Sequence, residues 1–149
     1  MTQPPPPTAN EVAWSTHLAE KMSGVAEFRC IDGSRVDILT ETLAIEVEWV
    51  KKWKESVGQA LLYQALTGRQ GCVLLLLRNK PTELLYVLRC AVACAAAGIK
   101  LLFCDTMSPD ESDCPPCSSM LGCPCCGRRS TSPTRRRTVT DPFGGLWPV

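Results

Sequence analysis

Several residue types and patterns that would point to a particular chemistry are scarce in this sequence of 149 residues. His17 is the only histidine, and there is no G-x-S-x-G element. Acyl transfer through an activated serine is therefore not supported, and we expect His17 to lie on a helix surface. Charge of one sign is also lacking, since 16 Lys and Arg residues accompany 15 Asp and Glu residues. The net charge of +1 means that any polyanion would have to be held by a local cluster of cations.

Long apolar runs are missing as well. The longest, CVLLLL at 72–77 and AVACAAAGI at 91–99, are well short of the roughly 20 residues that span a bilayer. The first residues, MTQPPPPTANE, include neither the basic nor the apolar region of a secretory signal. We therefore expect no membrane partner, and the default prediction is a cytoplasmic location.

Cysteine, by contrast, is abundant, with 10 residues in two groups. One group lies in apolar segments, where a free cysteine behaves as a small hydrophobic residue and is expected in the core. Its members are Cys30, Cys72, Cys90, Cys94 and Cys104. The other group lies in CPPCSSMLGCPCC at 114–126 and provides enough thiolates for one tetrahedral Zn²⁺. The spacing is not that of a common zinc knuckle, so a disordered segment without metal is the alternative.

Composition divides the chain into three parts. Residues 1–10 contain four consecutive prolines and are expected to form an extended leader. Residues 11–105 show dense hydrophobic periodicity and are predicted to form a single domain. Residues 106–149 are rich in Pro, Ser, Thr, Cys and Arg, which predicts a disordered, low-complexity tail. Its RRSTSPTRRR segment is a basic patch suited to nonspecific phosphate binding.

Hydrophobic periodicity predicts the order αβββαβαβ within the domain. Helices are expected at 11–23, 52–67 and 81–97, and strands at 25–31, 35–39, 43–50, 72–77 and 99–104. Asn10 is a candidate N-cap, and Gly68 and Gly98 are candidate C-caps. A meander followed by two strand–helix crossovers implies an α/β fold, in which a mixed sheet has helices on both faces.

Acidic residues recur on the second and third predicted strands. Asp37 interrupts the apolar segment VDIL, and Glu46 and Glu48 share one face of the strand IEVEW. Carboxylates on adjacent short strands can converge, and Mg²⁺ bound by one or two of them would relieve their repulsion. The alternative is that this face belongs to a half-exposed hairpin and is simply solvated.

The helix that follows adds polar residues where a helix packed on a sheet normally has apolar ones. Lys52 lies four residues after Glu48, and Gln59 and Tyr63 lie one turn apart on a single face. Lys52 could reach back over the carboxylates to a phosphate or an attacking water. In the alternative interpretation, Lys51, Lys52 and Lys54 are only the solvated start of a helix. The residues expected to face the sheet are Trp53, Val57, Ala60, Leu61 and Ala65.

The segment VDILTETLAIEVEWVKKWKESVGQALLYQALTG at 36–68 resembles the PD-(D/E)XK nuclease superfamily, which has a restriction-endonuclease-like fold. It is particularly similar to small bacterial nuclease-fold proteins with a VDLLT, AIEV, KW, GQ and Y pattern. The resemblance covers most of residues 11–105 and none of the tail. It implies an αβββαβ core and Mg²⁺- or Mn²⁺-dependent hydrolysis of phosphodiester bonds in nucleic acid, with DNA favoured as the partner.

The resemblance also implies roles for the acidic residues. Asp37 and Glu46 would be the metal ligands. The position of the usual catalytic lysine, two residues after the second acid, is occupied by Glu48, which would be a third ligand or mark a site that has lost cleavage. Glu20 would be the additional acid that many members carry on the first helix, with Glu11 as the competing candidate.

Four residues of the next predicted helix receive roles in the same way. Some members relocate the lysine to this helix, and Lys52 is the matching candidate, with Lys51 as a neighbouring substrate-binding cation. Gln59 and Tyr63 resemble the Q-x-x-x-Y element of RecB-like members, in which the glutamine assists at the active site and the tyrosine contacts nucleic acid or packs nearby.

Three functional classes therefore remain open from the sequence. The first is a Mg²⁺-dependent nuclease. The second is a nuclease-fold protein without catalytic activity that binds nucleic acid or a protein partner. The third is a zinc-binding interaction module that acts through its cysteine-rich tail.

Overall fold

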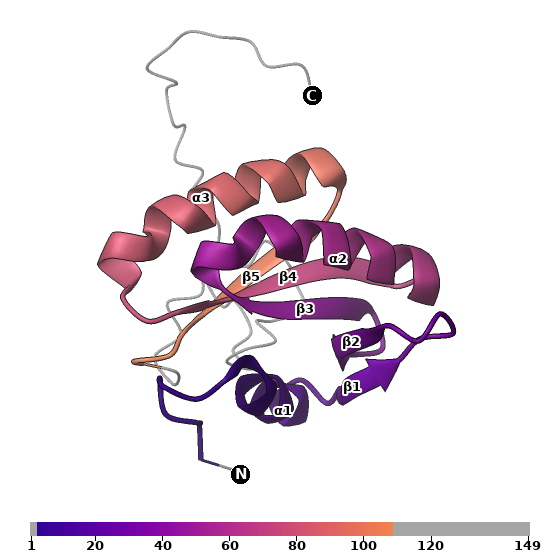
Figure 1. Cartoon of the computed structure of the whole chain (residues 1–149), viewed down its shortest axis with the longest axis horizontal. Coiled ribbons are helices and arrows are strands. Elements are labelled where there is room, and N and C mark those ends of the chain that lie inside the picture. Colours follow the sequence, from indigo (N-terminus) through magenta and orange to yellow (C-terminus); the bar gives the residue numbers. More distant parts are fainter. Residues whose placement is uncertain (1–2, 109–149) are drawn as a thin grey trace, which may run out of the picture.

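The computed structural model describes residues 3–108, which form three helices packed on a five-stranded sheet (Figure 1). The elements in chain order are α1 (Glu11–Lys21), β1 (Val25–Arg29), β2 (Arg35–Leu39), β3 (Leu43–Trp49), a 3₁₀ turn (Val50–Lys52), α2 (Trp53–Thr67), β4 (Gln70–Leu77), α3 (Lys80–Ala97) and β5 (Lys100–Asp105). The predicted order is confirmed, and most boundaries lie within two residues of the prediction.

The sheet has the strand order β1-β2-β3-β4-β5 and is mixed. The first three strands pair antiparallel as a meander, whereas β3, β4 and β5 are parallel. Figure 1 shows α1 beneath the sheet and α2 and α3 above it. The α/β class and the placement of helices on both faces are therefore confirmed.

Local sequence signals explain where the helices begin and end. The Asn10 side chain accepts a hydrogen bond from the Ala13 amide at 3.0 Å and caps α1. Gly68 and Gly98 adopt left-handed conformations with φ of 68° and 69° and terminate α2 and α3. The 3₁₀ turn between β3 and α2 was not predicted, so Lys52 precedes α2 instead of beginning it.

The core consists of an apolar layer on each face of the sheet. β4 is buried on both faces, so that Leu74 and Leu76 meet α1 while Val73 and Leu75 lie with α3. All five cysteines of the domain are buried and free, as predicted.

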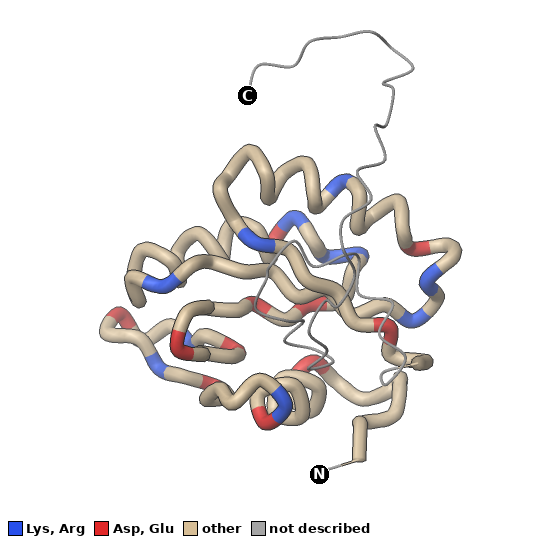
Figure 2. The backbone as a smooth tube through the Cα atoms, turned by 180° about the vertical axis from the view of Figure 1, so that it is seen from behind, with Lys and Arg blue, Asp and Glu red and all other residues tan. Residues whose placement is uncertain are grey.

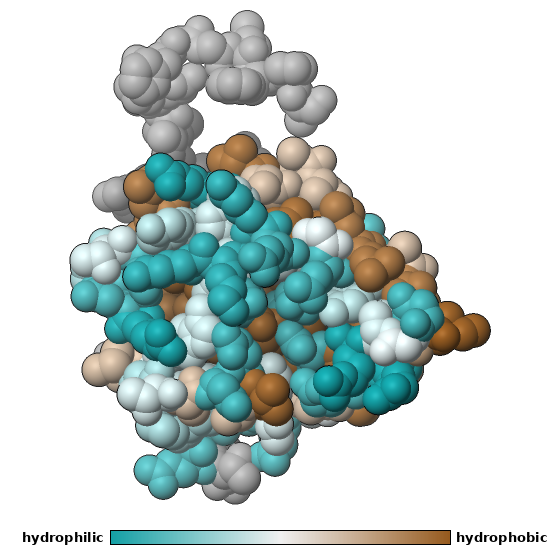
Figure 3. Space-filling model, in the orientation of Figure 1, coloured by the Kyte–Doolittle hydropathy of each residue, from teal (hydrophilic) through white to brown (hydrophobic). Residues whose placement is uncertain are grey.

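Some apolar surface is left outside this core, and Figure 3 shows hydrophobic atoms along the outer face of α3. The exposed residues there are Leu84, Leu85, Leu88 and Val92.

Three expectations about individual segments are wrong. His17 is only 5% exposed and makes an edge-to-face contact with Trp14, so it belongs to the core and not to a helix surface. The leader is not uniformly extended, because the Ala9 amide donates to the Pro6 carbonyl and closes a turn. Thr106 is buried and bonds to the Leu77 carbonyl, so the ordered fold continues past residue 105.

No helix among residues 3–108 has the length and apolar character needed to cross a bilayer. The tail beyond residue 108 lies outside the described residues, and so do the predictions about its order, its zinc and its arginines.

Candidate functional site

The candidate site begins where β2 and β3 stop pairing. Ile38 opposes Ile45 and Leu39 opposes Ala44, and the next residues along the two strands are Asp37 and Glu46. Beyond that point Asp37 Oδ2 accepts a hydrogen bond of 2.7 Å from the Val47 amide, in place of a backbone carbonyl of β2. The carboxyl group of Asp37 is thus fixed against β3 by a backbone donor, a contact that residue types alone could not reveal.

The other neighbour of Asp37 is also irregular. The β1–β2 register pairs Ala26 with Ile38 and Phe28 with Val36, and it leaves Glu27 unpaired between them. Glu27 has a φ of 54°, a left-handed conformation that costs a residue with a side chain about 1–2 kcal/mol. Asp37 therefore lies where the ladders on both sides of β2 are interrupted.

Asp37, which is half-buried, and Glu46, which is buried, form a carboxyl pair. Glu46 is 5% exposed and shares a hydrogen bond with Asp37. Burial, followed by the negative charge of Asp37 and this hydrogen bond, raises the pKa of Glu46 to about 9. Burial likewise raises the pKa of Asp37, although the Val47 amide opposes the shift. The prediction that the two carboxyl groups converge is confirmed, and at neutral pH the free pair retains a proton.

This burial excludes the solvated-hairpin interpretation. Every residue of β3 from Leu43 to Glu48 is buried, because α1 covers one face of the strand and α2 covers the other. Placing an ionised carboxylate in such surroundings is unfavourable unless it is neutralised or hydrogen-bonded.

Gln59 and Tyr63 of α2 provide those hydrogen bonds. With its nitrogen facing Glu46, the Gln59 amide donates to the two carboxyl oxygens at 3.0 and 3.3 Å and to the Tyr63 hydroxyl oxygen at 3.1 Å. The opposite orientation would place the amide oxygen against those carboxyl oxygens. The Tyr63 hydroxyl is hydrogen-bonded to Gln59, and burial, followed by the Glu46 charge, raises the pKa of that hydroxyl. The Q-x-x-x-Y spacing thus places both side chains at the acidic pair, as predicted.

The apolar stripe predicted on α2 is right for Ala60, which is buried, and for Trp53 and Val57, which pack against the same core cluster. It is wrong for Leu61 and Ala65, which are exposed, and the polar residues Ser56 and Tyr63 are buried instead. A Cβ atom on Gly71 of β4 would come within 2.6 Å of the Ala60 carbonyl oxygen, so α2 lies directly on the strand at that point.

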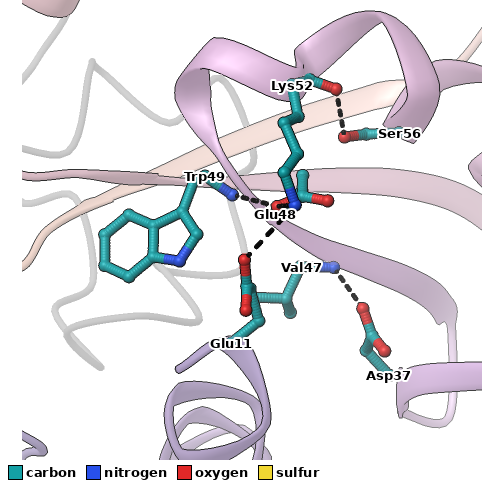
Figure 4. Close-up of polar contacts among 7 residues, drawn as sticks. All are labelled: Glu11, Asp37, Val47, Glu48, Trp49, Lys52 and Ser56. Atoms are coloured by element: carbon teal, nitrogen blue, oxygen red, sulfur yellow. Dashed lines mark hydrogen bonds and ion pairs between the residues drawn. The ribbon is translucent and has the colours of Figure 1, made fainter. Parts of the chain in front are cut away.

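Lys52 lies in a second polar group. Its ammonium is 3.5 Å from Glu48 Oε1 and 3.7 Å from Glu11 Oε1, and Glu48 also accepts a 2.8 Å hydrogen bond from the Trp49 amide (Figure 4). Glu48 and then Glu11 raise the pKa of Lys52, so the ammonium remains charged. Burial raises the pKa of Glu48, and the Trp49 amide and Lys52 oppose that shift.

The structure changes the interpretation of several predicted residues. Lys52 contacts Glu48 and Glu11 instead of extending over Asp37 and Glu46. Glu48 is occupied by this ion pair, and no cluster of three or more metal-binding side chains occurs within residues 3–108, so a three-carboxylate site is not formed. Of the two acids considered on α1, Glu11 lies at the polar group.

The remaining two predicted residues lie at the surface. Glu20 is exposed, nine residues beyond Glu11 and so about 13 Å further along α1, because a helix rises 1.5 Å per residue. Lys51 is an exposed residue of the 3₁₀ turn.

The donor set that remains suits a hard divalent cation. Mg²⁺ is commonly held by one or two carboxylates and completes its octahedron with water and substrate phosphate, which two carboxyl groups such as Asp37 and Glu46 would allow. Replacement of the retained proton by a cation would also relieve the repulsion within the pair. The chain matches no model of a protein family, no curated protein and no solved structure.

Proposed function

We propose that this protein is a Mg²⁺-dependent nuclease that hydrolyses phosphodiester bonds in DNA, with Asp37 and Glu46 as the metal ligands. The observation that carries the proposal is the pair of half-buried Asp37 and buried Glu46, whose carboxyl groups interact under Gln59 and Tyr63. Burial of two mutually repelling acids destabilises the free fold, and such an arrangement is typical of a functional site. The resemblance of residues 36–68 to the PD-(D/E)XK nucleases supports the same reaction.

Each residue has a distinct part in the proposed site. The Val47 amide fixes Asp37, and Gln59 and Tyr63 orient Glu46. Asp37 and Glu46 would hold Mg²⁺, which would supply Lewis-acid polarisation of the phosphate and activation of a water. The side chain of Lys52 is 56% exposed, and exposed ion pairs are weak, so its ammonium can exchange Glu48 or Glu11 for a substrate phosphate.

Cleavage assays with conservative variants test this function. The full chain is incubated with supercoiled plasmid and with single-stranded DNA in Mg²⁺, Mn²⁺ or EDTA. We expect cleavage that requires the metal and falls by at least about 10²-fold in Asp37→Asn and Glu46→Gln, because these substitutions remove a metal ligand while preserving shape. Glu20→Gln, which changes an exposed acid on α1, is the matched control and should retain activity.

Mn²⁺ binding followed by electron paramagnetic resonance provides a second readout. Wild-type protein and Glu20→Gln should bind Mn²⁺, whereas Asp37→Asn and Glu46→Gln should bind it much more weakly. Metal-independent cleavage, or unchanged Mn²⁺ binding in both variants, would contradict the proposed site.

The Lys52–Glu48–Glu11 group favours a second candidate, a DNA-binding protein without cleavage activity. In this alternative Lys52 stays with its two carboxylates, and the proton on the Asp37–Glu46 pair is permanent. DNA binding without cleavage in either metal, together with no Mn²⁺ binding, would favour it over the nuclease.

A further inference from the structure

Arg78 and Trp49 form a stacked pair at the end of two neighbouring strands. The Arg78 Cζ atom lies 3.8 Å from the centroid of the Trp49 ring. Trp49 is the last residue of β3, and Arg78 immediately follows β4. The strands are parallel with Trp49 opposite Leu76, so the two side chains meet at the carboxyl-terminal edge of the sheet. Open α/β sheets commonly bind ligands at this edge.

The protein fixes the Arg78 guanidinium without neutralising it. Its Nε donates to the Pro7 carbonyl at 3.2 Å, which ties the leader segment to the sheet edge. Glu83 accepts from the Arg78 and Asn79 backbone amides at 2.8 and 2.9 Å and so caps the start of α3. Within residues 3–108 Arg78 makes no ion pair with a carboxylate, and its Nη atoms have no protein acceptor.

This pair adjoins the second polar group. The Trp49 amide donates to Glu48, which binds Lys52, and Figure 4 places the Trp49 ring and Asp37 on opposite sides of Glu48. Figure 2 shows acidic and basic positions interspersed along the described chain. A polyanion would therefore depend on local cations, and Arg78 is an oriented one, stacked on the last residue of the strand that carries Glu46 and Glu48.

We infer that Arg78, oriented by Trp49 and Pro7, binds a backbone phosphate of the DNA strand held at the proposed nuclease site. An arginine guanidinium presents paired N–H donors that match two phosphate oxygens, and stacking on an aromatic ring fixes its plane before binding. The inference rests on the proposed function for its choice of DNA. It concerns affinity for the strand and assigns Arg78 no part in bond cleavage.

Fluorescence anisotropy with a labelled DNA oligonucleotide tests the inference. The full chain is titrated in EDTA at several salt concentrations, so that no cleavage occurs. We expect Arg78→Gln to weaken binding about tenfold and to reduce the slope of log K against log salt by about 1, as the loss of one phosphate contact predicts. Arg89→Gln is the matched control, because Arg89 is an exposed arginine in the middle of α3. It should leave both quantities unchanged.

Variants of Trp49 separate the orientation of Arg78 from simple charge. Trp49→Phe keeps an aromatic face for Arg78 and should bind nearly as wild type, whereas Trp49→Leu should lose affinity as Arg78→Gln does. Arg78→Lys keeps the positive charge but loses the paired N–H donors. Its slope of log K against log salt should equal that of wild type, while its affinity should stay below that of wild type. Thermal unfolding by circular dichroism verifies that each variant is folded at the assay temperature.

Several outcomes would overturn the inference. One is equal loss of affinity in Arg78→Gln and Arg89→Gln, and another is an unchanged salt slope in folded Arg78→Gln. RNA of the same sequence that binds more tightly through Arg78, or inorganic phosphate that displaces DNA at micromolar concentration, would replace DNA as the ligand. If the protein cleaves DNA but Arg78→Gln binds DNA as tightly as wild type, only the inference about Arg78 is wrong. If Arg78→Gln weakens DNA binding but the wild-type protein does not cleave DNA, only the proposed nuclease activity is wrong.

Discussion

Glu46 and Glu48 stand two residues apart on the same buried strand, yet their carboxyl groups have opposite partners. Glu46 meets another acid, Asp37, and neutral donors from α2. Glu48 meets the ammonium of Lys52 and the Trp49 amide. The first environment favours a retained proton or a bound cation, whereas in the second Lys52 and the Trp49 amide favour the charged carboxylate. Similar burial of the same residue type thus gives one candidate ligand and one internal counter-ion.

The largest expected effect that tests the difference between Glu46 and Glu48 comes from substitution of Lys52, the partner of Glu48. We expect Lys52→Ala to reduce DNA cleavage about 10²–10³-fold, because loss of a charge that stabilises the transition state typically has this size. Lys51→Ala and Lys54→Ala should retain activity, since Lys51 is exposed in the 3₁₀ turn, Lys54 is exposed at the start of α2, and neither has an ion pair with Glu48 or Glu11. Initial rates on plasmid DNA provide the measurement.

Two outcomes of that series would change the assignment. Equal losses in all three variants would mean that the lysines act as a diffuse phosphate patch. Full activity in Lys52→Ala would leave Lys52 as the counter-ion of Glu48 and Glu11 alone.

A pH series sharpens the difference between the two glutamates. The pKa of Glu46 is about 9 in the folded protein and near 4.5 in the unfolded chain, so the folded state retains a proton that the unfolded chain releases. This group therefore stabilises the fold fully below pH 4.5, and its contribution is lost as the pH rises towards 9. In EDTA we expect the free energy of unfolding to fall by at most about 1.4 kcal/mol per pH unit within this window.

Urea unfolding of wild type and variants between pH 5 and pH 8 measures this dependence. Glu46→Gln should flatten it, and Glu48→Gln should flatten it less, because Lys52 opposes the rise in the pKa of Glu48. Parallel curves for wild type and Glu46→Gln would show that Glu46 is ionised in the folded protein. Added Mg²⁺ should stabilise wild type more at pH 8 than at pH 5, since a bound cation replaces the proton.

The smallest expected effect concerns the contact that places α2 over Glu46. Gly71→Ala would bring a methyl group within 2.6 Å of the Ala60 carbonyl oxygen and 2.7 Å of Ile99 Cδ1. We expect a loss of about 1–3 kcal/mol in stability, as is usual for overpacking. Thermal and urea unfolding report the loss. Displacement of α2 should also reduce the burial of Glu46 and so lower its pKa. The pH range over which the free energy of unfolding falls should then be narrower than in wild type, and the contribution of Glu48 should not change.

Gly58→Ala is the matched control for this substitution. Gly58 lies in α2, and a Cβ atom there would meet nothing within 4 Å. Alanine is the better helix former, so this variant should be stabilised by up to about 1 kcal/mol. Destabilisation by Gly58→Ala equal to that by Gly71→Ala would show that the helix itself, and not its contact with β4, is responsible.

Local sequence patterns explain the order of the elements, several of their ends and much of the acidic site. The period of the apolar residues defines helices and strands, and Asn10, Gly68 and Gly98 cap helices through contacts within a few residues. Alternation along β3 placed Glu46 and Glu48 on one face, and helical spacing placed Gln59 and Tyr63 together. These relations depend only on residues close together in the sequence, so they hold wherever the segment lies in the fold.

Which of these residues meet, and in which state of charge, depends on how the helices and strands pack together. The bond from the Val47 amide to Asp37, the ion pair between Glu11 and Lys52 and the stacking of Arg78 on Trp49 join residues that are distant in sequence. Their contacts depend on strand register and on which helix covers which face, and no local pattern specifies these. The burial of His17 and Glu46 also follows from packing, because the charge that a side chain can carry depends on the elements that exclude water from it.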